Sequence, residues 1–271
     1  MAHVDVAGGR LFVEVDGDDD APPVVLLHAD VATSRMWDAL VPVLAADHRV
    51  VQFDRRGSGR STTRATVFDP RQDLVEVLDR LGVSRGVVVG AAEGGRLALD
   101  LALARPERVA GLVLLAPGVS GAPESVLTIQ EQRAADEVGR AREAGDARAL
   151  VEATVALRSV GPSRASGGPG PDVAARLLEL HVGNVDHVLG KLAPREPERP
   201  AWDRLGQVRV PSLVVVGDDG LVAERQVATH VASHLPDVTF VLVEGAGHLP
   251  SVERPDEVAA SVRRWLAAYG L

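Results

Sequence analysis

Short apolar runs rich in valine and leucine recur along the chain and alternate with longer stretches of helical periodicity. The runs lie at 10–15, 23–29, 49–54, 86–90, 111–117, 212–218 and 238–245. Continuous runs of this kind indicate strands that are buried on both faces, as in a parallel sheet covered by helices. The start of the chain differs, because two alternating segments flank Gly8 and Gly9 and predict an antiparallel hairpin. The pattern therefore predicts an α/β protein with a mostly parallel, eight-stranded sheet flanked by helices.

Helix start and stop signals lie between these runs. Asp69 before Pro70 predicts an N-cap followed by proline at the first helical position, and this helix is expected to end at Gly82. A helix that follows the run at 86–90 is expected to end near Pro106. The last helix begins around Pro255, with acidic residues in its first turn where the helix dipole favours them.

Residues 119–205 differ in character, because they contain amphipathic helical patterns and no strand-like run. The helix candidates are 124–145, 146–160 and 171–192, and a glycine- and proline-rich break lies at 161–171. We predict a core formed by 1–118 and 206–271, with 119–205 inserted as a helical lid over the carboxyl edge of the sheet, where open α/β sheets bind ligands. An accessory helical subdomain without a gating role is the alternative.

Composition and charge narrow the classes of partner. The 271 residues are 46% hydrophobic, enough for one domain with a large core, and the net charge of −9 argues against nucleic acid and anionic membrane surfaces. No apolar run reaches the roughly 18 residues of a membrane-spanning helix, and no signal-peptide pattern begins the chain. We therefore expect a cytoplasmic protein, a monomer or homodimer, that binds a hydrophobic small molecule. Cysteine is absent, and no spacing of histidines and carboxylates predicts a metal; no cofactor motif is found.

Five segments, in the same order along the chain, resemble the α/β-hydrolase superfamily. They are 24–44 (VVLLHADVATSRMWDALVPVL), 53–61 (FDRRGSGRS), 90–95 (GAAEGG), 211–220 (PSLVVVGDDG) and 245–255 (GAGHLPSVERP). They are similar to that family's oxyanion loop, its D-x-R-G-x-G-x-S block, its nucleophile elbow, its acid loop and its histidine loop. The resemblance covers essentially the whole chain and implies the α/β-hydrolase fold.

The elbow of that superfamily, G-x-S-x-G, holds a nucleophilic serine on a strained turn between strand and helix. Here Gly90 and Gly94 keep the frame, but Ala92 stands at the serine position, so the resemblance implies a member whose nucleophile is replaced by alanine. A methyl group forms no acyl-enzyme, and loss of the serine alone costs about a million-fold in a comparable triad enzyme. A deliberate replacement in an ordinary esterase is the alternative.

The acid and oxyanion positions also depart from the family pattern. The resemblance places the catalytic acid at Gly220, which leaves Asp219 as the candidate substitute. It places the oxyanion hole at Ala29, Asp30 and Glu93, where two carboxylates would repel a developing oxyanion in a water-poor pocket. The alternative is that these acidic residues are solvated loop charges.

His248 matches the catalytic histidine of the family. Its charge changes near neutral pH, so with Asp30, Glu93 or Asp219 as partner it can act as a general acid or base without a nucleophile. Among the remaining histidines, only His181 and His187 are candidates to face the pocket. The residues expected to be structural and near the site are His28, Trp37, Asp54 and Arg56.

Three hypotheses account for this pattern. The first is a non-hydrolytic enzyme that uses His248 for elimination, cyclisation, isomerisation or carbon–carbon bond formation on a hydrophobic small molecule such as a natural-product intermediate. The second is an ester or lactone hydrolase present as a Ser-to-Ala inactive form. The third is a ligand-binding protein of this fold without catalysis.

Overall fold

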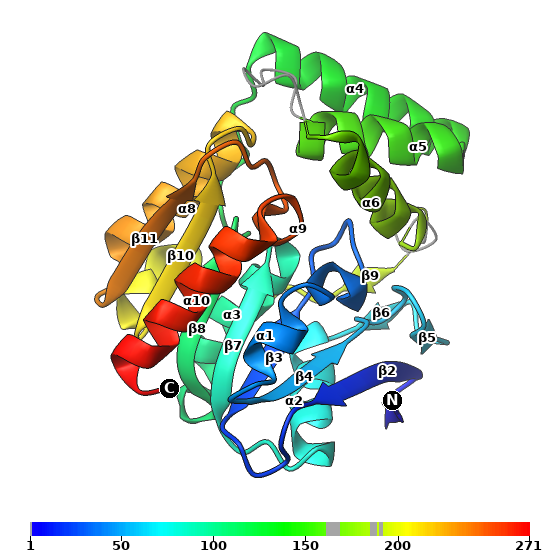
Figure 1. Ribbon diagram of the computed structural model, residues 1–271. Coiled ribbons are helices and arrows are strands. Elements are labelled where there is room, and N and C mark those ends of the chain that lie inside the picture. The colour runs from blue at the N-terminus through cyan, green and yellow to red at the C-terminus, as the bar shows by residue number, and fades with distance from the viewer. Residues whose placement is uncertain (1, 161–168, 185–188, 190–191) are drawn as a thin grey trace.

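The computed structural model describes residues 2–160, 169–184, 189 and 192–271 (Figure 1). Within these residues a nine-stranded sheet has the main order β1-β2-β4-β3-β7-β8-β10-β11, and the short β5 pairs with β2. Its strands are β1 (Ala2–Val6), β2 (Gly9–Asp16), β3 (Pro23–Leu27), β4 (Arg49–Phe53), β5 (Thr62–Thr63), β7 (Gly86–Ala91), β8 (Val109–Leu115), β10 (Ser212–Gly217) and β11 (Val238–Val243). A separate small sheet pairs β6 (Val67–Phe68) with β9 (Ala193–Pro194).

The sheet is mixed, with its parallel part at the centre. All neighbours from β4 to β11 are parallel, whereas β2 is antiparallel to both β1 and β4. The hairpin predicted around Gly8 and the mostly parallel sheet are therefore confirmed. The short strand β9 interrupts a segment for which no strand was expected.

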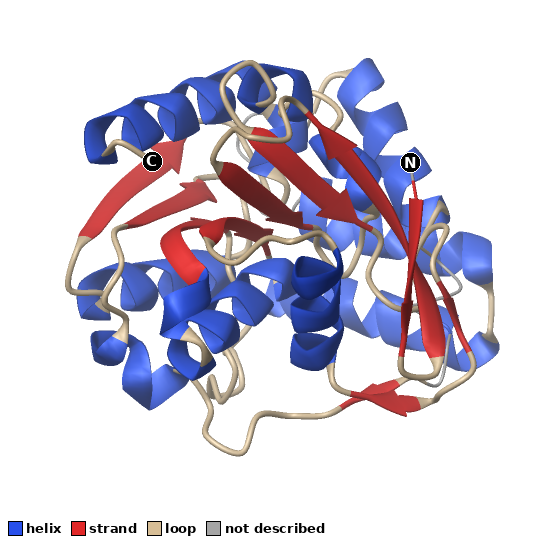
Figure 2. Ribbon diagram, turned by 90° about the horizontal axis from the view of Figure 1, so that it is seen from below, coloured by secondary structure: helices blue, strands red, loops and turns tan. Residues whose placement is uncertain are grey.

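Helices cover both faces of this sheet (Figure 2). They are α1 (Val41–Leu44), α2 (Pro70–Arg80), α3 (Glu93–Ala104), α4 (Ile129–Ala144), α5 (Ala147–Thr154), α6 (Pro171–Val182), α8 (Val222–His234), α9 (Pro250–Glu253) and α10 (Pro255–Tyr269), with 3-10 helices η1 (Ser34–Trp37), η2 (Pro106–Arg108) and η4 (Trp202–Gln207) and the π-helix η3 (Val155–Val160). One apolar core lies between the sheet and α2, α3 and α8, and a second lies between the sheet and α1 and α10.

The boundaries predicted for the helices of the core agree with the structure, whereas α4 begins at Ile129 and α6 ends at Val182, inside the predicted segments 124–145 and 171–192. The carboxylate of Asp69 accepts a hydrogen bond from Arg71 N, and Pro70 is the first residue of α2. Gly82 follows the helix with a φ of +68°, the left-handed conformation that glycine adopts without a steric penalty. The helix after the elbow ends at Ala104 and the last helix begins at Pro255, as predicted.

The expectation that every apolar run is buried on both faces is wrong for β11. This strand lies at the edge of the sheet, and Phe240 and Leu242 are 43% and 54% exposed. An edge strand has a neighbour on one side only, so the next strand does not shield its side chains. Valine and phenylalanine favour the extended backbone here without full burial.

The segment between β8 and β10 carries α4, α5, η3 and α6, which lie together at one end of the sheet (Figure 1). α6 contacts α9, and η3 continues directly from α5. Ala201 and Leu205, near the end of this segment, are buried in the core shared with α3 and α8. The predicted break at 161–171 lies largely outside the described residues.

Candidate active site

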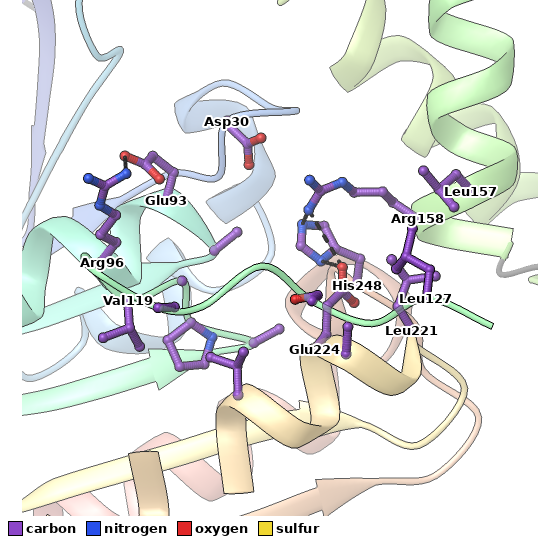
Figure 3. Close-up of a pocket in the computed structure, with 18 of the residues that line it drawn as sticks. Asp30, Glu93, Arg96, Val119, Leu127, Leu157, Arg158, Leu221, Glu224 and His248 are labelled. Atoms are coloured by element: carbon purple, nitrogen blue, oxygen red, sulfur yellow. Dashed lines mark hydrogen bonds and ion pairs between the residues drawn. The ribbon is translucent and has the colours of Figure 1, made fainter. Parts of the chain in front are cut away.

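Loops at the carboxyl ends of four parallel strands meet around one cavity of about 460 Å³ (Figure 3). Asp30 follows β3, Ala92 follows β7, Pro117 follows β8 and His248 follows β11. The helical segment adds Arg158 from η3 to the lining of this cavity. This is the edge at which open α/β sheets bind their ligands.

Ala92 occupies a sharp turn between β7 and α3. Its φ of 46° and ψ of −113° are unfavourable for a residue with a side chain, and such strain costs on the order of 1–3 kcal/mol. The turn needs glycines around it, because a Cβ on Gly94 would lie 2.1 Å from Leu27 O and a Cβ on Gly90 would lie 2.3 Å from Gly94 O. The backbone thus directs the side chain of residue 92 to the cavity, where it supplies a methyl group and no nucleophilic atom.

His248 is held by a carboxylate that the sequence pattern does not predict. Glu224 Oε1, in the first turn of α8, lies 2.9 Å from His248 Nδ1 (Figure 3). Arg158 Nη1 donates to His248 Nε2 over 3.4 Å and also lies 3.5 Å from Glu224 Oε1, so this arginine contacts both members of the pair. Because a guanidinium group only donates, Nε2 accepts this bond and the ring proton is placed on Nδ1, facing Glu224. This tautomer leaves Nε2 without a proton, as a general base needs, and its lone pair is directed at Arg158, a bond that a substrate proton would have to replace.

The charges around His248 keep Glu224 ionised. Burial acts to raise the pKa of Glu224, but the interactions with His248 and Arg158 outweigh it, and the pKa lies below its usual value. The position at a helix N-terminus favours a carboxylate further. Glu224 and Arg158 thus place one negative and one positive charge next to the imidazole, and the two groups also form an ion pair with each other over 3.5 Å.

Asp30 and Glu93 lie at the predicted oxyanion region, and their pKa values are shifted in opposite directions. Burial acts to raise the pKa of Asp30, yet Arg158, His248, Arg55 and its own backbone N–H lower it to about 2. Burial raises the pKa of Glu93, and the nearby arginines only partly oppose this. Two carboxylates whose environments separate their pKa values are a common feature of acid/base sites.

Asp30 also affects the backbone N–H groups that could donate hydrogen bonds to a ligand at this site. Its carboxylate is next to its own backbone N–H, which helps to lower the pKa of Asp30 and is the group that the resemblance assigns to the oxyanion hole. The N–H of the adjacent Ala29 donates to Met36 Sδ over 3.3 Å. The Ala29 amide of this loop therefore has a partner within the protein.

Asp219, the predicted substitute for the acid, is not among the residues that line the cavity. Its backbone N–H bonds Ala246 O, in the turn that precedes His248. The carboxylate placed against Nδ1 comes instead from one helical turn beyond Gly220, at Glu224.

The four residues expected to be structural are all buried. His28 Nδ1 is 2.7 Å from Ala29 O, and its Nε2 accepts from Arg55 N. Asp54 accepts from Ser34 N and from Arg60 N, so it joins two loops. The remaining two, Trp37 and Arg56, are both buried.

His181 of α6 is buried close to the charged cluster. Burial lowers its pKa to about 4, with a further lowering from His248 and Arg158, so the ring is neutral at physiological pH. Its Nδ1 is 2.7 Å from Leu177 O. His187, the other candidate of this segment, lies outside the described residues.

Two residues of the cluster, Glu224 and Arg158, are absent from the set that the sequence predicts. For Glu224 a signal exists, since it is the next carboxylate after the GDDG loop and lies in the first turn of the following helix. For Arg158 there is none, because an arginine in an amphipathic segment is most often solvated, and its direction depends on the π-helical turn in which it lies.

The part of the chain that the structure describes contains no group of three or more His, Cys, Asp or Glu side chains suited to a metal ion. None of the helices described is both long and apolar enough to cross a membrane.

Comparison with known proteins gives matches over nearly the whole chain. Residues 22–255 match the family model described as the alpha/beta hydrolase fold. A relative from Variovorax paradoxus named "Putative carbamate hydrolase RutD" is 30% identical over 256 residues, 89% of this chain and 90% of the relative. One from Bacillus subtilis named "Putative 2-succinyl-6-hydroxy-2,4-cyclohexadiene-1-carboxylate synthase" is 29% identical over 270 residues, 92% and 91% of the two chains. The crystal structure of the esterase RhEst1 from Rhodococcus sp. ECU1013 has a TM-score of 0.79 and 26% identity, with 98% of each chain covered.

Proposed function

The chain belongs to the alpha/beta hydrolase fold family, and we propose that it is an enzyme of this family that uses His248 as a general base without a covalent intermediate. The observation that carries this proposal is the 2.9 Å contact between His248 Nδ1 and Glu224 Oε1 in a cavity where residue 92 is alanine. The base and its partner are assembled, while the turn that would hold a nucleophile bears a methyl group.

Elimination is the reaction that fits these groups best. His248 Nε2 removes a proton from a carbon next to a carbonyl, the electron pair forms an enolate, and the bond to a leaving group on the next carbon then breaks. Glu224 stabilises the imidazolium that forms, and Arg158, 3.4 Å from Nε2, stabilises the enolate oxygen. Glu93, whose pKa is raised, is the candidate to protonate the leaving group. General-base catalysis of this kind contributes roughly 10²–10⁴-fold.

The carboxylate of Asp30 supports this choice over acyl transfer. With a pKa of about 2 it is ionised at neutral pH, next to its own backbone amide. A tetrahedral oxyanion at that amide would face a negative charge in a medium of low dielectric constant. An enolate beside Arg158 instead faces a guanidinium charge.

We propose that the helical segment at 119–205 acts as a lid. It contributes Leu127, Leu157 and Arg158 to the cavity, which the core residues Ala116 and Leu221 also line. These aliphatic walls favour a hydrophobic substrate, and a closed lid would exclude water from the enolate. The relative from Bacillus subtilis, by its printed name a synthase, supports chemistry other than hydrolysis in this family.

Hydrolysis is the second candidate function. The printed names of other similar proteins, a carbamate hydrolase and an esterase, favour it. In that case Ala92 stands where a serine would complete the site, and restoring it would restore activity.

The test compares the protein with its Ala92→Ser variant on short p-nitrophenyl esters by stopped flow across pH 6 to 9. We expect no burst of p-nitrophenolate from either form, because Asp30 opposes the oxyanion in both. A burst from Ala92→Ser that disappears in Ala92→Ser/His248→Ala would establish a functional hydrolase frame and reject the proposal.

A further inference from the structure

A second cavity, of about 300 Å³, lies beside the first and shares Asp30, Glu93 and Arg96 with it. Its outer wall comes from the small sheet of β6 and β9, which contributes Phe68 and Pro194. The cavity is therefore enclosed between the main sheet and a ribbon that joins two distant parts of the chain. The elimination proposed above does not use it.

Arg55 is the cation of this cavity that lacks a bonding partner. Its Nε and Nη2 atoms are buried and have no hydrogen-bond partner among the described residues. Burial lowers the pKa of Arg55, and the charges of Glu93 and Asp30 act in the opposite direction. Buried polar groups are nearly always hydrogen-bonded, and a buried charge without a bond costs free energy. A buried donor that lacks a hydrogen bond and faces a cavity therefore indicates a site where a ligand supplies the missing partner.

The other arginines of the cavity are already engaged. Arg56 holds Asp73 with two hydrogen bonds, from Nε over 2.8 Å and from Nη2 over 2.6 Å. Arg96 forms an ion pair with Glu196, and its Nη1 lies 3.4 Å from Glu93 Oε1. Arg55 is thus the group available for an anion that enters the cavity.

We propose that the second cavity binds the carboxylate of an organic acid through Arg55. A guanidinium group matches a carboxylate with two parallel hydrogen bonds, which satisfies the donors that are otherwise unbonded. The apolar side chains of Phe53, Phe68 and Leu97 in the same cavity favour an aryl or alkyl acid over an inorganic anion. This inference rests on the proposed function, because it makes the substrate a carboxylate whose reactive carbon lies at His248 in the adjoining cavity.

Binding of three probes by isothermal titration calorimetry at pH 7.5 tests the proposal. Benzoate carries the charge and the ring, benzamide carries the ring alone, and inorganic phosphate carries the charge alone. We expect benzoate to bind the unmodified protein at least about ten-fold more tightly than either other probe. Arg55→Gln is expected to weaken benzoate binding by about ten- to a hundred-fold, the effect of a charge-assisted hydrogen bond.

Arg158→Gln is the matched control, since it removes the unshared arginine of the first cavity. It is expected to leave the benzoate affinity within about two-fold. Loss of benzoate binding in Arg158→Gln but not in Arg55→Gln would place the anion in the first cavity and overturn the proposal. Equal binding of benzoate and benzamide, or tighter binding of phosphate, would overturn it as well.

Two further variants separate folding and catalysis from binding. Arg55→Lys keeps the charge but loses the planar fork, so its benzoate affinity should fall between those of the unmodified protein and Arg55→Gln. If Arg55→Gln does not fold, Arg55→Lys tests the proposal in its place. A benzoate affinity of Arg55→Lys equal to that of the unmodified protein would then contradict the proposal. His248→Ala should bind benzoate normally, so a failure of the proposed elimination would leave the Arg55 result unaffected.

Discussion

Because His181 is neutral in the folded protein, the free energy of unfolding is expected to depend on pH by an amount that can be calculated. This ring is buried on α6, and its pKa of about 4 in the folded protein compares with 6.5 for a free histidine. As pH falls below 6.5, the unfolded chain takes up a proton at this position while the folded protein does not. The free energy of unfolding is therefore expected to fall between pH 6.5 and pH 4.

The size of the effect follows from the two pKa values. Proton linkage gives a loss of about 2 kcal/mol between pH 7 and pH 5 from His181 alone, out of about 3 kcal/mol for the whole shift. His181→Gln cannot take up a proton, and the amide can still donate to Leu177 O. We expect the variant to lose about 2 kcal/mol less than the unmodified protein over this interval.

Urea unfolding followed by circular dichroism at pH 7 and pH 5 measures the difference. His234→Gln, in which an exposed histidine of α8 is replaced, is the control and should lose as much stability as the unmodified protein. Equal losses in the unmodified protein and in His181→Gln would refute the reasoning. They would mean that the imidazole is hydrated in the folded protein and that α6 does not pack over the charged cluster.

Two further predictions concern a catalytic contact and a buried ion pair. Glu224→Gln should lower the elimination rate by about two to four orders of magnitude, because the neutral amide cannot stabilise an imidazolium and favours the wrong tautomer of His248. An unchanged kcat would contradict a catalytic role for the pair of His248 and Glu224. Arg56→Gln should lower the free energy of unfolding, measured in urea, by about 3–5 kcal/mol, because it leaves the Asp73 carboxylate buried without the arginine that donates two hydrogen bonds to it. The control Arg263→Gln, on the surface, should change the free energy of unfolding by less than about 0.5 kcal/mol. Similar effects of the two arginine variants would contradict this account of the pair.

Most of the fold could be predicted because it depends on local pattern. Each apolar run contains one strand of the main sheet, since a strand buried between helices needs uninterrupted apolar side chains. Asp69 and Pro70 begin a helix where the cap satisfies a free N–H group. The short strands β6 and β9 could not be predicted, because two-residue pairings depend on where the tertiary structure brings their segments together.

The sequence predicted residues of the site only where they directly follow a strand of the sheet. Asp30, Ala92 and His248 follow β3, β7 and β11, so the sheet alone brings them together. Glu224 and Arg158 reach His248 from helices, and the direction of a helical side chain depends on packing that a single sequence does not specify. Asp219 is closer in sequence to the expected acid position, yet the structure places Glu224 against the ring.

The most direct measurement uses one chromophore released by two mechanisms. From 4-(4-nitrophenoxy)butan-2-one, p-nitrophenolate leaves after a base removes the proton next to the carbonyl, with butenone as the other product; from p-nitrophenyl acetate it leaves after nucleophilic attack. We predict that the protein accelerates release from the ether, that His248→Ala lowers this rate by about 100-fold or more, and that Ala92→Ser does not raise it. Release from the ester but not from the ether, or an ether rate that is unchanged in His248→Ala, would contradict catalysis by the His248 and Glu224 pair.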